Sequence, residues 1–246
     1  MRTRTLALAA AAAVLLTGCQ RTGDAGSPAP VASATQPAAA GNGVAELAAD
    51  EILQRSQAAV ERAESFRMQG DLSNEGERMT FDFKTDGRDL TGFMTKGAEK
   101  IGLLSVGGKQ YVRPNERFLA QMSGEPAKAR KVARRMGDRW VELTDKDQNL
   151  AGVFGAVSIG QWLDVAGKVT KGPVKEIDGT PAIGLVHEGT TGGTLYVATA
   201  GEPYPLRIEA PGTEKGQIDI SDFGATFPEL KAPARAEVTT FAQLMN

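Results

Sequence analysis

The spacing of apolar residues divides the chain into one long helix followed by two groups of strands. From Val44 to Glu64, apolar residues such as Leu47, Ile52 and Val60 recur at intervals of three to four, and charged residues take most of the other positions. This period is that of an amphipathic helix with a modest apolar stripe. We therefore expect the folded part of the chain to begin with a helix over residues 44–64.

After residue 65 the apolar period changes to two, which is typical of strands with one buried face. Met79, Phe81 and Phe83, for example, alternate with polar neighbours. Turn signals separate the segments, and Gly107-Gly108 between two of them is a good hairpin signal. The first group of strands that we expect comprises residues 66–72, 79–83, 90–96, 100–106 and 109–113.

A helical excursion interrupts the strands, and a second group of strands follows it. Residues 128–136 have the pattern of a helix and residues 140–143 that of a strand, whereas residues 149–155 fit no single pattern. Ser158 is a suitable N-cap for a short helix through Asp164. The remaining elements that we expect are strands over 169–177, 181–188, 194–199, 205–210 and 217–222, and a short closing helix over 239–245.

This order of elements predicts an α+β fold with a curved, mostly antiparallel sheet of about 10–11 strands. No internal repeat indicates a solenoid or a propeller. Helices packed on the concave face would bury the apolar side chains of the sheet. Residues 44–246 are 203 residues, long enough for one domain that buries roughly 70% of its unfolded surface.

The first 18 residues have the layout of a secretory signal. Arg2 and Arg4 give a basic start, and the apolar run Leu6–Leu16 follows. The run has 11 residues, whereas a helix that spans a bilayer needs about 20. Thr3 separates the two arginines, so the twin-arginine pattern is not met. We therefore expect a signal peptide over residues 1–18.

The segment Leu16-Thr17-Gly18-Cys19 resembles the lipobox of bacterial lipoproteins, in which Leu and two small residues precede Cys. The resemblance implies cleavage before Cys19 and attachment of a diacylglycerol to its sulfur. The protein would then be held on the extracytoplasmic face of the cell membrane. Residues 19–43 are rich in Gly, Ala, Ser, Thr and Pro, which predicts a disordered tether between this anchor and the domain.

Composition excludes several kinds of chemistry. Cys19 is the only cysteine, so its modification would leave no thiol for a disulfide, a zinc-thiolate site or a nucleophile. Loss of residues 1–18 would change the formal net charge from −2 to −4, because Arg2 and Arg4 are the only charged residues in that segment. A general nucleic-acid binder would be basic. We therefore expect no nucleic-acid partner.

Candidate catalytic and metal-binding motifs are weak. His187 is the only histidine, and the chain has neither a Gly-x-Ser-x-Gly elbow nor a Ser-x-x-Lys pair. Residues 145–149 begin like an EF-hand loop, but Leu150 and Ala156 stand where the loop needs Gly and Glu. Residues 222–224, Asp-Phe-Gly, resemble the metal-binding tripeptide of kinases, but the chain lacks the other kinase motifs. We expect a solvated turn at residues 145–149 and no enzyme, metal site or cofactor.

The predicted helix over 128–136 carries a dense group of basic residues. We consider four of them, Lys128, Lys131, Arg134 and Arg135, as candidates for contact with the headgroups of a membrane surface. Each cation near an anionic surface contributes about 1 kcal/mol. The alternative, a solvated helix face, is the commoner origin of such a pattern.

The first group of strands concentrates the larger apolar side chains. As candidates for the lining of an apolar cavity we take Phe66, Met68, Leu72, Met79, Phe81, Phe83, Phe93, Met94, Ile101 and Leu103. Methionine and phenylalanine give an adaptable lining that suits flexible alkyl chains. The alternative is an ordinary core packed on the first helix, which is the default interpretation of such residues.

The order of the segments resembles the LppX/LprG-like lipoproteins, relatives of the LolA/LolB carriers, over about residues 44–233. Besides the lipobox and the first helix and strands, the resemblance rests on Ile177-Asp178-Gly179-Thr180, Leu195-Tyr196-Val197, Pro205-Leu206-Arg207-Ile208 and Ile218-x-Ile220-Ser221-Asp222-Phe223-Gly224. It implies a half-barrel closed by helices, with an apolar cavity that shields acyl chains from water during transfer.

We therefore expect a non-enzymatic, membrane-anchored monomer that binds the acyl chains of a lipid or lipoglycan. The alternative is a sensor or interaction lipoprotein with a filled core that binds an envelope partner. The first function predicts a continuous apolar cavity. The second predicts a filled core and an exposed apolar patch.

Overall fold

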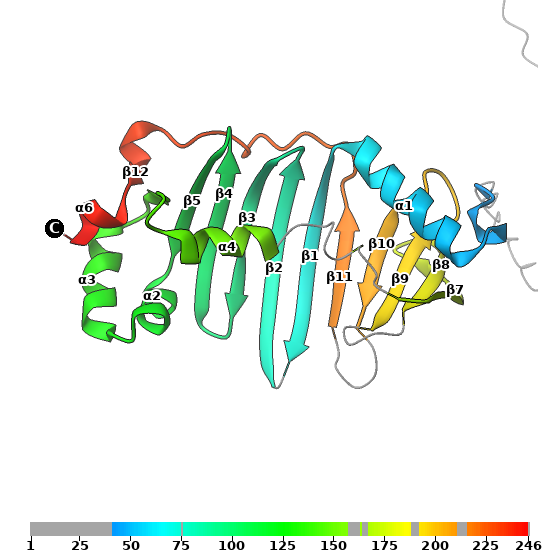
Figure 1. The fold of residues 1–246 in the computed structure, drawn as a ribbon, viewed down its shortest axis with the longest axis horizontal. Helices are drawn as coiled ribbons and strands as arrows, with labels where there is room; N and C mark the ends of the chain where they lie inside the picture. Colours follow the sequence, from blue (N-terminus) through cyan, green and yellow to red (C-terminus); the bar gives the residue numbers. More distant parts are fainter. Residues whose placement is uncertain are drawn as a thin grey trace, which may run out of the picture. The chain divides into compact units, whose positions relative to one another are not determined.

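The chain folds around one open sheet in which two meanders meet at a central pair of strands. The computed structural model describes residues 41–74, 76–156, 163, 167–187, 192–210 and 216–245. These residues form a 12-stranded sheet in the order β12-β6-β5-β4-β3-β2-β1-β11-β10-β9-β8-β7 (Figure 1). They belong to one compact unit, Ala39–Asn246. Cys19, the predicted signal peptide and most of the predicted tether lie outside the described residues.

The first meander supplies one half of the sheet. Its strands are β1 (Ser65–Asn74), β2 (Glu77–Asp86), β3 (Asp89–Lys96), β4 (Glu99–Val106), β5 (Lys109–Pro114) and β6 (Trp140–Glu142). Each strand pairs antiparallel with the next. Gly107 and Gly108 have φ angles of 58° and 78°, as a tight hairpin turn of the primed type requires. The predicted hairpin between β4 and β5 is therefore confirmed.

The second meander supplies the other half and returns to the first. It consists of β7 (Val169–Ile177), β8 (Thr180–His187), β9 (Gly193–Ala198), β10 (Pro205–Glu209) and β11 (Gly216–Ser221). The last of these, β11, pairs antiparallel with β1, so that Met68 faces Ile220. The two meanders therefore share one continuous hydrogen-bonded sheet.

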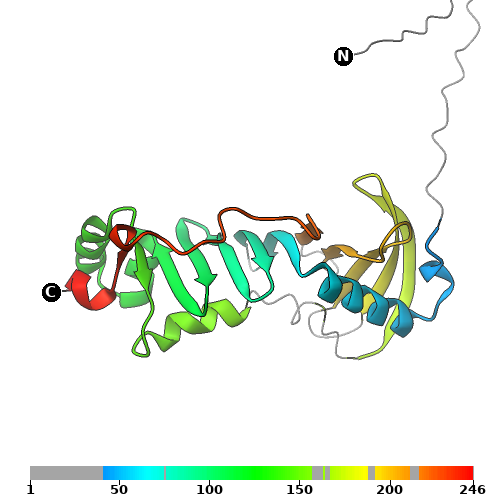
Figure 2. The ribbon, with the colours of Figure 1, turned by 90° about the horizontal axis from the view of Figure 1, so that it is seen from above.

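The chain after β11 runs along the ends of the strands to the far edge of the sheet (Figures 1 and 2). Ser65 holds its start, because the Gly224 amide donates to the Ser65 carbonyl at 2.9 Å. The segment ends in η2 (Arg235–Glu237) and in β12 (Val238–Thr239), which pairs parallel with β6.

The helices fall into two groups. α1 (Ala49–Ala63) and α4 (Gln148–Ala156) lie on the same face of the sheet (Figure 2). α2 (Glu116–Ser123), α3 (Pro126–Met136) and α6 (Phe241–Met245) gather beside the edge that β6 and β12 form (Figure 1). Within the described ranges, no helix combines the length and the apolarity that a membrane crossing needs.

The predicted first helix is interrupted near its start. Val44–Glu46 forms a 3-10 turn, η1, and Leu47 and Ala48 are extended with ψ angles of 166° and 153° before α1 begins. Asn42 fixes this start, because its side chain donates to the carbonyl of Ala198 at 3.1 Å and accepts from the Val44 amide at 3.1 Å. Residues 41–43, which the sequence pattern assigned to the tether, are thus bonded to the sheet.

The predicted fold class, a curved α+β fold with an antiparallel sheet, is confirmed, with 12 strands in the described residues instead of 10–11. The additional strand is β12, which has only two residues. The unassigned residues 149–155 belong to α4, and α2 is a helix that the sequence pattern did not predict. The helix predicted over 158–164 lies outside the described residues, apart from Leu163.

Candidate functional site

One face of the sheet is apolar across both meanders. A single row of cross-strand neighbours runs over the nine strands from β5 to β8 without a charged side chain. The row consists of Pro114, Ile101, Met94, Phe81, Gly70, Ile218, Ile208, Leu195 and Leu185. Ile52 of α1 and Leu150 of α4 belong to the same core cluster as this row. We call this side of the sheet the apolar face.

The adjoining row, one residue along each strand, lies on the opposite face, because side chains alternate along a strand. It consists of Arg113, Gly102, Phe93, Asp82, Gln69, Asp219, Arg207, Tyr196 and Gly184. Four of these nine residues are charged. We call this side the polar face.

The prediction that Phe93 belongs with the other lining residues is wrong, because Phe93 lies on the polar face. Its cross-strand neighbours are Asp82 and Gly102, and Lys100 Nζ lies 4.3 Å from the centre of its ring. A cation over an aromatic ring is a favourable contact even near solvent, which accounts for a phenylalanine at this position. Met94, the next residue, is on the apolar face.

The other nine predicted lining residues lie together on the apolar face. Six of them have exposed fractions of 0–6%, namely Phe66, Met68, Phe81, Phe83, Ile101 and Leu103. Leu72, Met79 and Met94 are half-buried. They are neighbours, since Leu72 pairs with Met79 and Met94 pairs with Phe81, two residues from Met79. The more exposed part of the nine therefore lies toward the β1–β2 hairpin.

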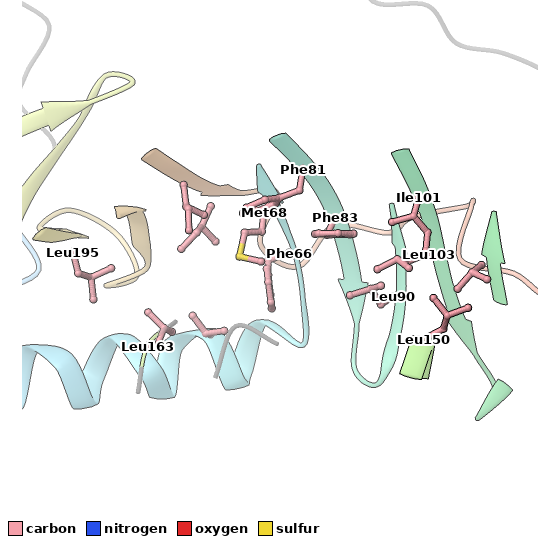
Figure 3. Close-up of a cluster of buried hydrophobic side chains, with 14 of the residues drawn as sticks. Phe66, Met68, Phe81, Phe83, Leu90, Ile101, Leu103, Leu150, Leu163 and Leu195 are labelled. Atoms are coloured by element: carbon pink, nitrogen blue, oxygen red, sulfur yellow. The ribbon is translucent and has the colours of Figure 1, made fainter. Parts of the chain in front are cut away.

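The rings of Phe81 and Phe83, drawn in Figure 3, lie close to glycines of the neighbouring strands. A Cβ atom on Gly70 would be 2.2 Å from the ring of Phe81, and one on Gly92 would be 2.6 Å from Cδ1 of Phe83. The two rings are themselves stacked, with centroids 5.5 Å apart. The rings thus occupy space next to the backbone that side chains would otherwise fill.

α1, which lies over β1 and the strands of the second meander (Figure 1), buries a hydroxyl group. Ile52, Ser56 and Ala59 of α1 are fully buried. Among the described residues, neither the Ser56 Oγ atom nor the buried Thr85 Oγ1 atom of β2 has a hydrogen-bond partner. Buried hydroxyls without a hydrogen-bond partner are uncommon.

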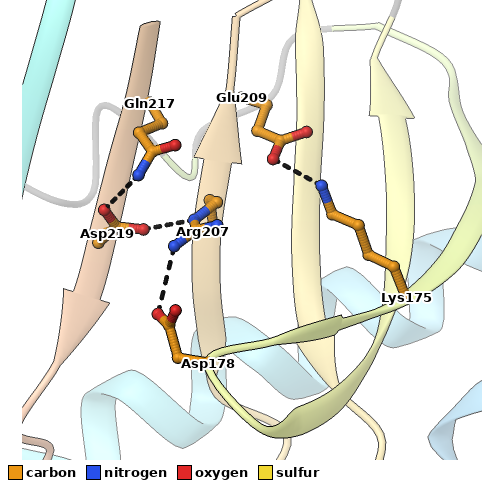
Figure 4. Close-up of polar contacts among 6 residues, drawn as sticks. All are labelled: Lys175, Asp178, Arg207, Glu209, Gln217 and Asp219. Carbon is orange, nitrogen blue, oxygen red and sulfur yellow. Dashed lines mark hydrogen bonds and ion pairs between the residues drawn. The ribbon is translucent and has the colours of Figure 1, made fainter.

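Ion pairs join several of the charged side chains on the polar face (Figure 4). Arg207 contacts Asp219 through Nε and Asp178 through Nη2, the latter at 3.2 Å. Lys175 Nζ lies 2.6 Å from a carboxylate oxygen of Glu209. The hydrogen bond to Glu209 raises the pKa of Lys175 above its ordinary value.

A groove of about 970 Å³ crosses the polar face near the β1–β2 hairpin. Its acidic residues are paired in the same way, since Arg78 contacts both oxygens of Asp71 and Arg67 Nε donates to Asp82 at 2.8 Å. The hydrogen bond from Arg78 lowers the pKa of Asp71. A groove lined by ion pairs is a poor environment for an alkyl chain.

The discarded motifs have structural explanations. The amide and hydroxyl of Thr144 donate to Asp147 Oδ2 at 2.8 and 2.7 Å, so residues 145–149 include the expected turn before α4. Phe223 stacks on Tyr204 with ring centroids 4.0 Å apart, in the turn after β11. His187 ends β8. The described ranges contain no group of three or more His, Cys, Asp or Glu side chains that could hold a metal ion.

The four basic candidates on α3 differ in their contacts. Lys128 lies 3.4 Å from Glu125, and Arg135 donates to the Leu244 carbonyl at 2.9 Å. Lys131 and Arg134 are exposed. Neither has an ion-pair partner within the described part of the chain. Only these two cations therefore remain available to a partner.

Sequence reasoning missed the contribution of the second meander to the apolar face. Ile218, Ile208, Leu195 and Leu185 continue the row that begins in the first meander. Their alternation with polar or small residues was visible in the predicted strands. What the pattern lacked was the pairing of β11 with β1, which places them beside Gly70.

The known structures similar to this chain include two mycobacterial lipoproteins and a LolA superfamily protein. LprF from Mycobacterium bovis is 14% identical with a TM-score of 0.49, and the match covers 76% of this chain and 97% of that one. The lipoprotein LppX from Mycobacterium tuberculosis is 14% identical with a TM-score of 0.43, covering 70% and 93%. A LolA superfamily protein from Nitrosomonas europaea is 13% identical with a TM-score of 0.25, covering 74% and 96%.

No family model and no curated protein sequence matches the chain. The identities are 13–14% and the TM-scores are below 0.5, so the ligand has to be argued from the geometry of the sheet.

Proposed function

We propose that the protein is a membrane-anchored, extracytoplasmic lipoprotein that holds the acyl chains of a lipid or lipoglycan against its apolar face. The observation that carries the proposal is the uncharged row over nine adjacent strands. Strands are about 4.8 Å apart, so eight spacings give a surface about 38 Å long. Each CH₂ group removed from water there contributes about 0.8 kcal/mol, and no covalent chemistry is needed.

The half-buried end of the apolar face is the proposed entrance for the acyl chain. Met79 and Met94 have unbranched, flexible side chains that can rearrange around an alkyl group. Leu72 lies beside them. Farther along the face, the Ser56 hydroxyl offers a hydrogen bond to a polar group of the bound lipid.

The proposed protein is a carrier or a binding protein and has no catalytic activity. His187 is the only histidine in the sequence, so a pair of histidines is not available for catalysis. The ion pairs on the polar face hold their carboxylates in contact with cations. A nucleophile with an adjacent base, which covalent catalysis requires, is not apparent among these groups.

A second function, binding of an envelope protein by a domain with a filled core, is favoured by the burial of the apolar face. Phe83, Ile101 and Leu103 are 0% exposed. Protein interiors are close-packed, and side chains buried to this degree can be covered entirely by the protein itself. Lipid content therefore distinguishes the two functions.

Mass spectrometry of lipid extracted from the purified protein provides the first test. We expect acyl lipid to co-purify in stoichiometric amount and a fluorescent fatty acid to bind after its removal. Absence of both co-purified lipid and probe binding would contradict the acyl-binding function and favour the second function, binding of an envelope protein.

The anchor is tested separately at Cys19. We expect Cys19→Ala to prevent acylation and to shift the protein from the membrane fraction to the soluble extracytoplasmic fraction. Labelling with a radioactive fatty acid and cell fractionation measure the two effects. A Cys19→Ala protein that incorporates label and remains in the membrane fraction would contradict the proposed anchor.

A further inference from the structure

α3 presents a basic stripe on the side away from the core. The residues that the helix buries are Ala129, Val132 and Met136. Arg130, Lys131 and Arg134 follow the opposite side at helical spacing, and all three are exposed. The stripe is therefore directed to the outside of the protein.

The charges of this stripe are only partly balanced. Arg130 lies 3.2 Å from Glu116 in an exposed ion pair. Lys131 and Arg134 have no ion-pair partner among the residues that the structure describes. Residues 116–139 contain seven basic and three acidic residues, a formal charge of +4, whereas the whole chain has −2. The positive charge is thus concentrated at the edge of the sheet where α2 and α3 lie.

Two exposed methionines lie on the helices that contact α3. Within the described ranges, the large apolar side chains that are exposed are Met122 (50%), Met245 (57%) and Val174 (69%). Met122 is on α2 and Met245 is on α6, and both helices pack against α3 (Figure 1). Val174 is on β7, at the opposite edge of the sheet. Unpaired cations and exposed apolar side chains therefore occur in the same group of helices.

We propose that the outer side of α3, together with Met122 and Met245, docks on the surface of an anionic lipid bilayer. Cations attract anionic headgroups, and flexible apolar side chains exposed on the neighbouring helices enter the boundary between headgroups and acyl chains. On the polar face, Arg207, Lys175, Arg67 and Arg78 are each paired with a carboxylate, whereas the net positive charge of residues 116–139 is not balanced within that segment. This surface goes beyond the acyl-binding function and does not depend on it.

The test places a reporter on this surface in the full-length chain. In a Cys19→Ala background, Met122→Cys supplies the single thiol for an environment-sensitive dye. Vesicles of phosphatidylcholine with phosphatidylglycerol should shift the dye emission to the blue, and vesicles of phosphatidylcholine alone should not. The dye reports contact with the bilayer at position 122 alone. Attachment of the protein to vesicles through its N-terminal apolar segment therefore does not change the comparison between the two kinds of vesicle.

Neutral variants and a second dye position complete the design. At about 1 kcal/mol for each cation, Lys131→Gln/Arg134→Gln should lower the ratio of docked to undocked protein about 30-fold. Arg88→Gln/Lys231→Gln removes two exposed cations elsewhere and should have little effect. A dye at Val174→Cys should show no shift.

Each of four results would overturn the proposal. These are no shift at position 122 on anionic vesicles, equal shifts on both kinds of vesicle, an equal shift at position 174, or docking unchanged in Lys131→Gln/Arg134→Gln. A shift produced by an acidic polypeptide and not by vesicles would also overturn the proposal. The partner of this surface would then be a protein and not a bilayer. Uptake of a fatty acid, measured separately, reports on the acyl-binding function alone.

Discussion

Gly92 illustrates how closely the apolar face is packed at the scale of single residues. A Cβ atom at this position would lie 2.0 Å from the carbonyl oxygen of Asp82 and 2.6 Å from Cδ1 of Phe83. The oxygen belongs to the backbone of a central strand, so it cannot move aside without disturbing the ladder between β2 and β3. A glycine at this position is therefore a requirement of the packing.

We expect Gly92→Ala to lower the free energy of unfolding by about 2 kcal/mol or more, because overpacking against backbone cannot be relieved by a change of rotamer. Urea denaturation measures the difference. Gly102→Ala on the next strand is the matched control, since its Cβ atom would meet the Trp140 ring at 3.4 Å, an ordinary contact. Equal losses in the two variants would contradict this account of Gly92.

Phe93 and Met94 show what the sequence can and cannot predict about a site. Adjacent residues of a strand face opposite sides, so the two could not both line one surface. Composition does not decide between them, because both are apolar. The choice depends on the register, which puts Met94 beside Phe81 and puts Phe93 beside Asp82. Register follows from the whole sheet and was not visible in this segment.

At the scale of elements, an ion pair holds the segment after β11 against β2. Lys84 contacts Glu229, and its Nζ atom lies 5.6 Å from the ring centroid of Phe227, which is buried. The hydrogen bond from Lys84 lowers the pKa of Glu229 below its ordinary value. A carboxyl whose pKa is lower in the folded state stabilises the fold above the pKa of the unfolded chain.

This contribution should be lost as the pH falls through the pKa of folded Glu229. We therefore expect Lys84→Met to raise the pKa of Glu229 toward its ordinary value and to weaken the acid dependence of stability slightly, because both side chains are partly exposed. Titration of the Glu229 carboxyl by NMR measures the pKa, and Lys231→Met is a control at an exposed lysine nearby in sequence. A pKa that does not respond to Lys84→Met would contradict the role of the pair.

Most elements were predictable, and the exceptions have physical reasons. The strands of both meanders follow a period of two that depends only on local sequence. α2 was missed, although Asn115 gives a capping signal and accepts from the Phe118 amide at 2.8 Å. β12 has two residues and exists only because the chain returns to β6. No local pattern encodes that return.

At the scale of the whole molecule, the pairing of β1 with β11 makes one long apolar face from two shorter ones. Met68 and Ile220 are far apart in the sequence and adjacent in the sheet. Without this pair, the apolar residues of β8 to β11 would be separate from those of β1 to β5. The candidate site is therefore a property of the topology, whereas the type of its residues was predictable from the sequence.

The central claim is that acyl chains bind to the apolar face, and the neighbours Met94 and Phe93 allow a direct test. The measurement is the affinity of the lipid-free protein for a fluorescent fatty acid in Met94→Trp and in Phe93→Trp, with folding checked by circular dichroism. We predict that Met94→Trp weakens binding at least about tenfold, because the added ring fills the proposed entrance, and that Phe93→Trp leaves binding unchanged. Equal affinities in the two folded variants would contradict the claim.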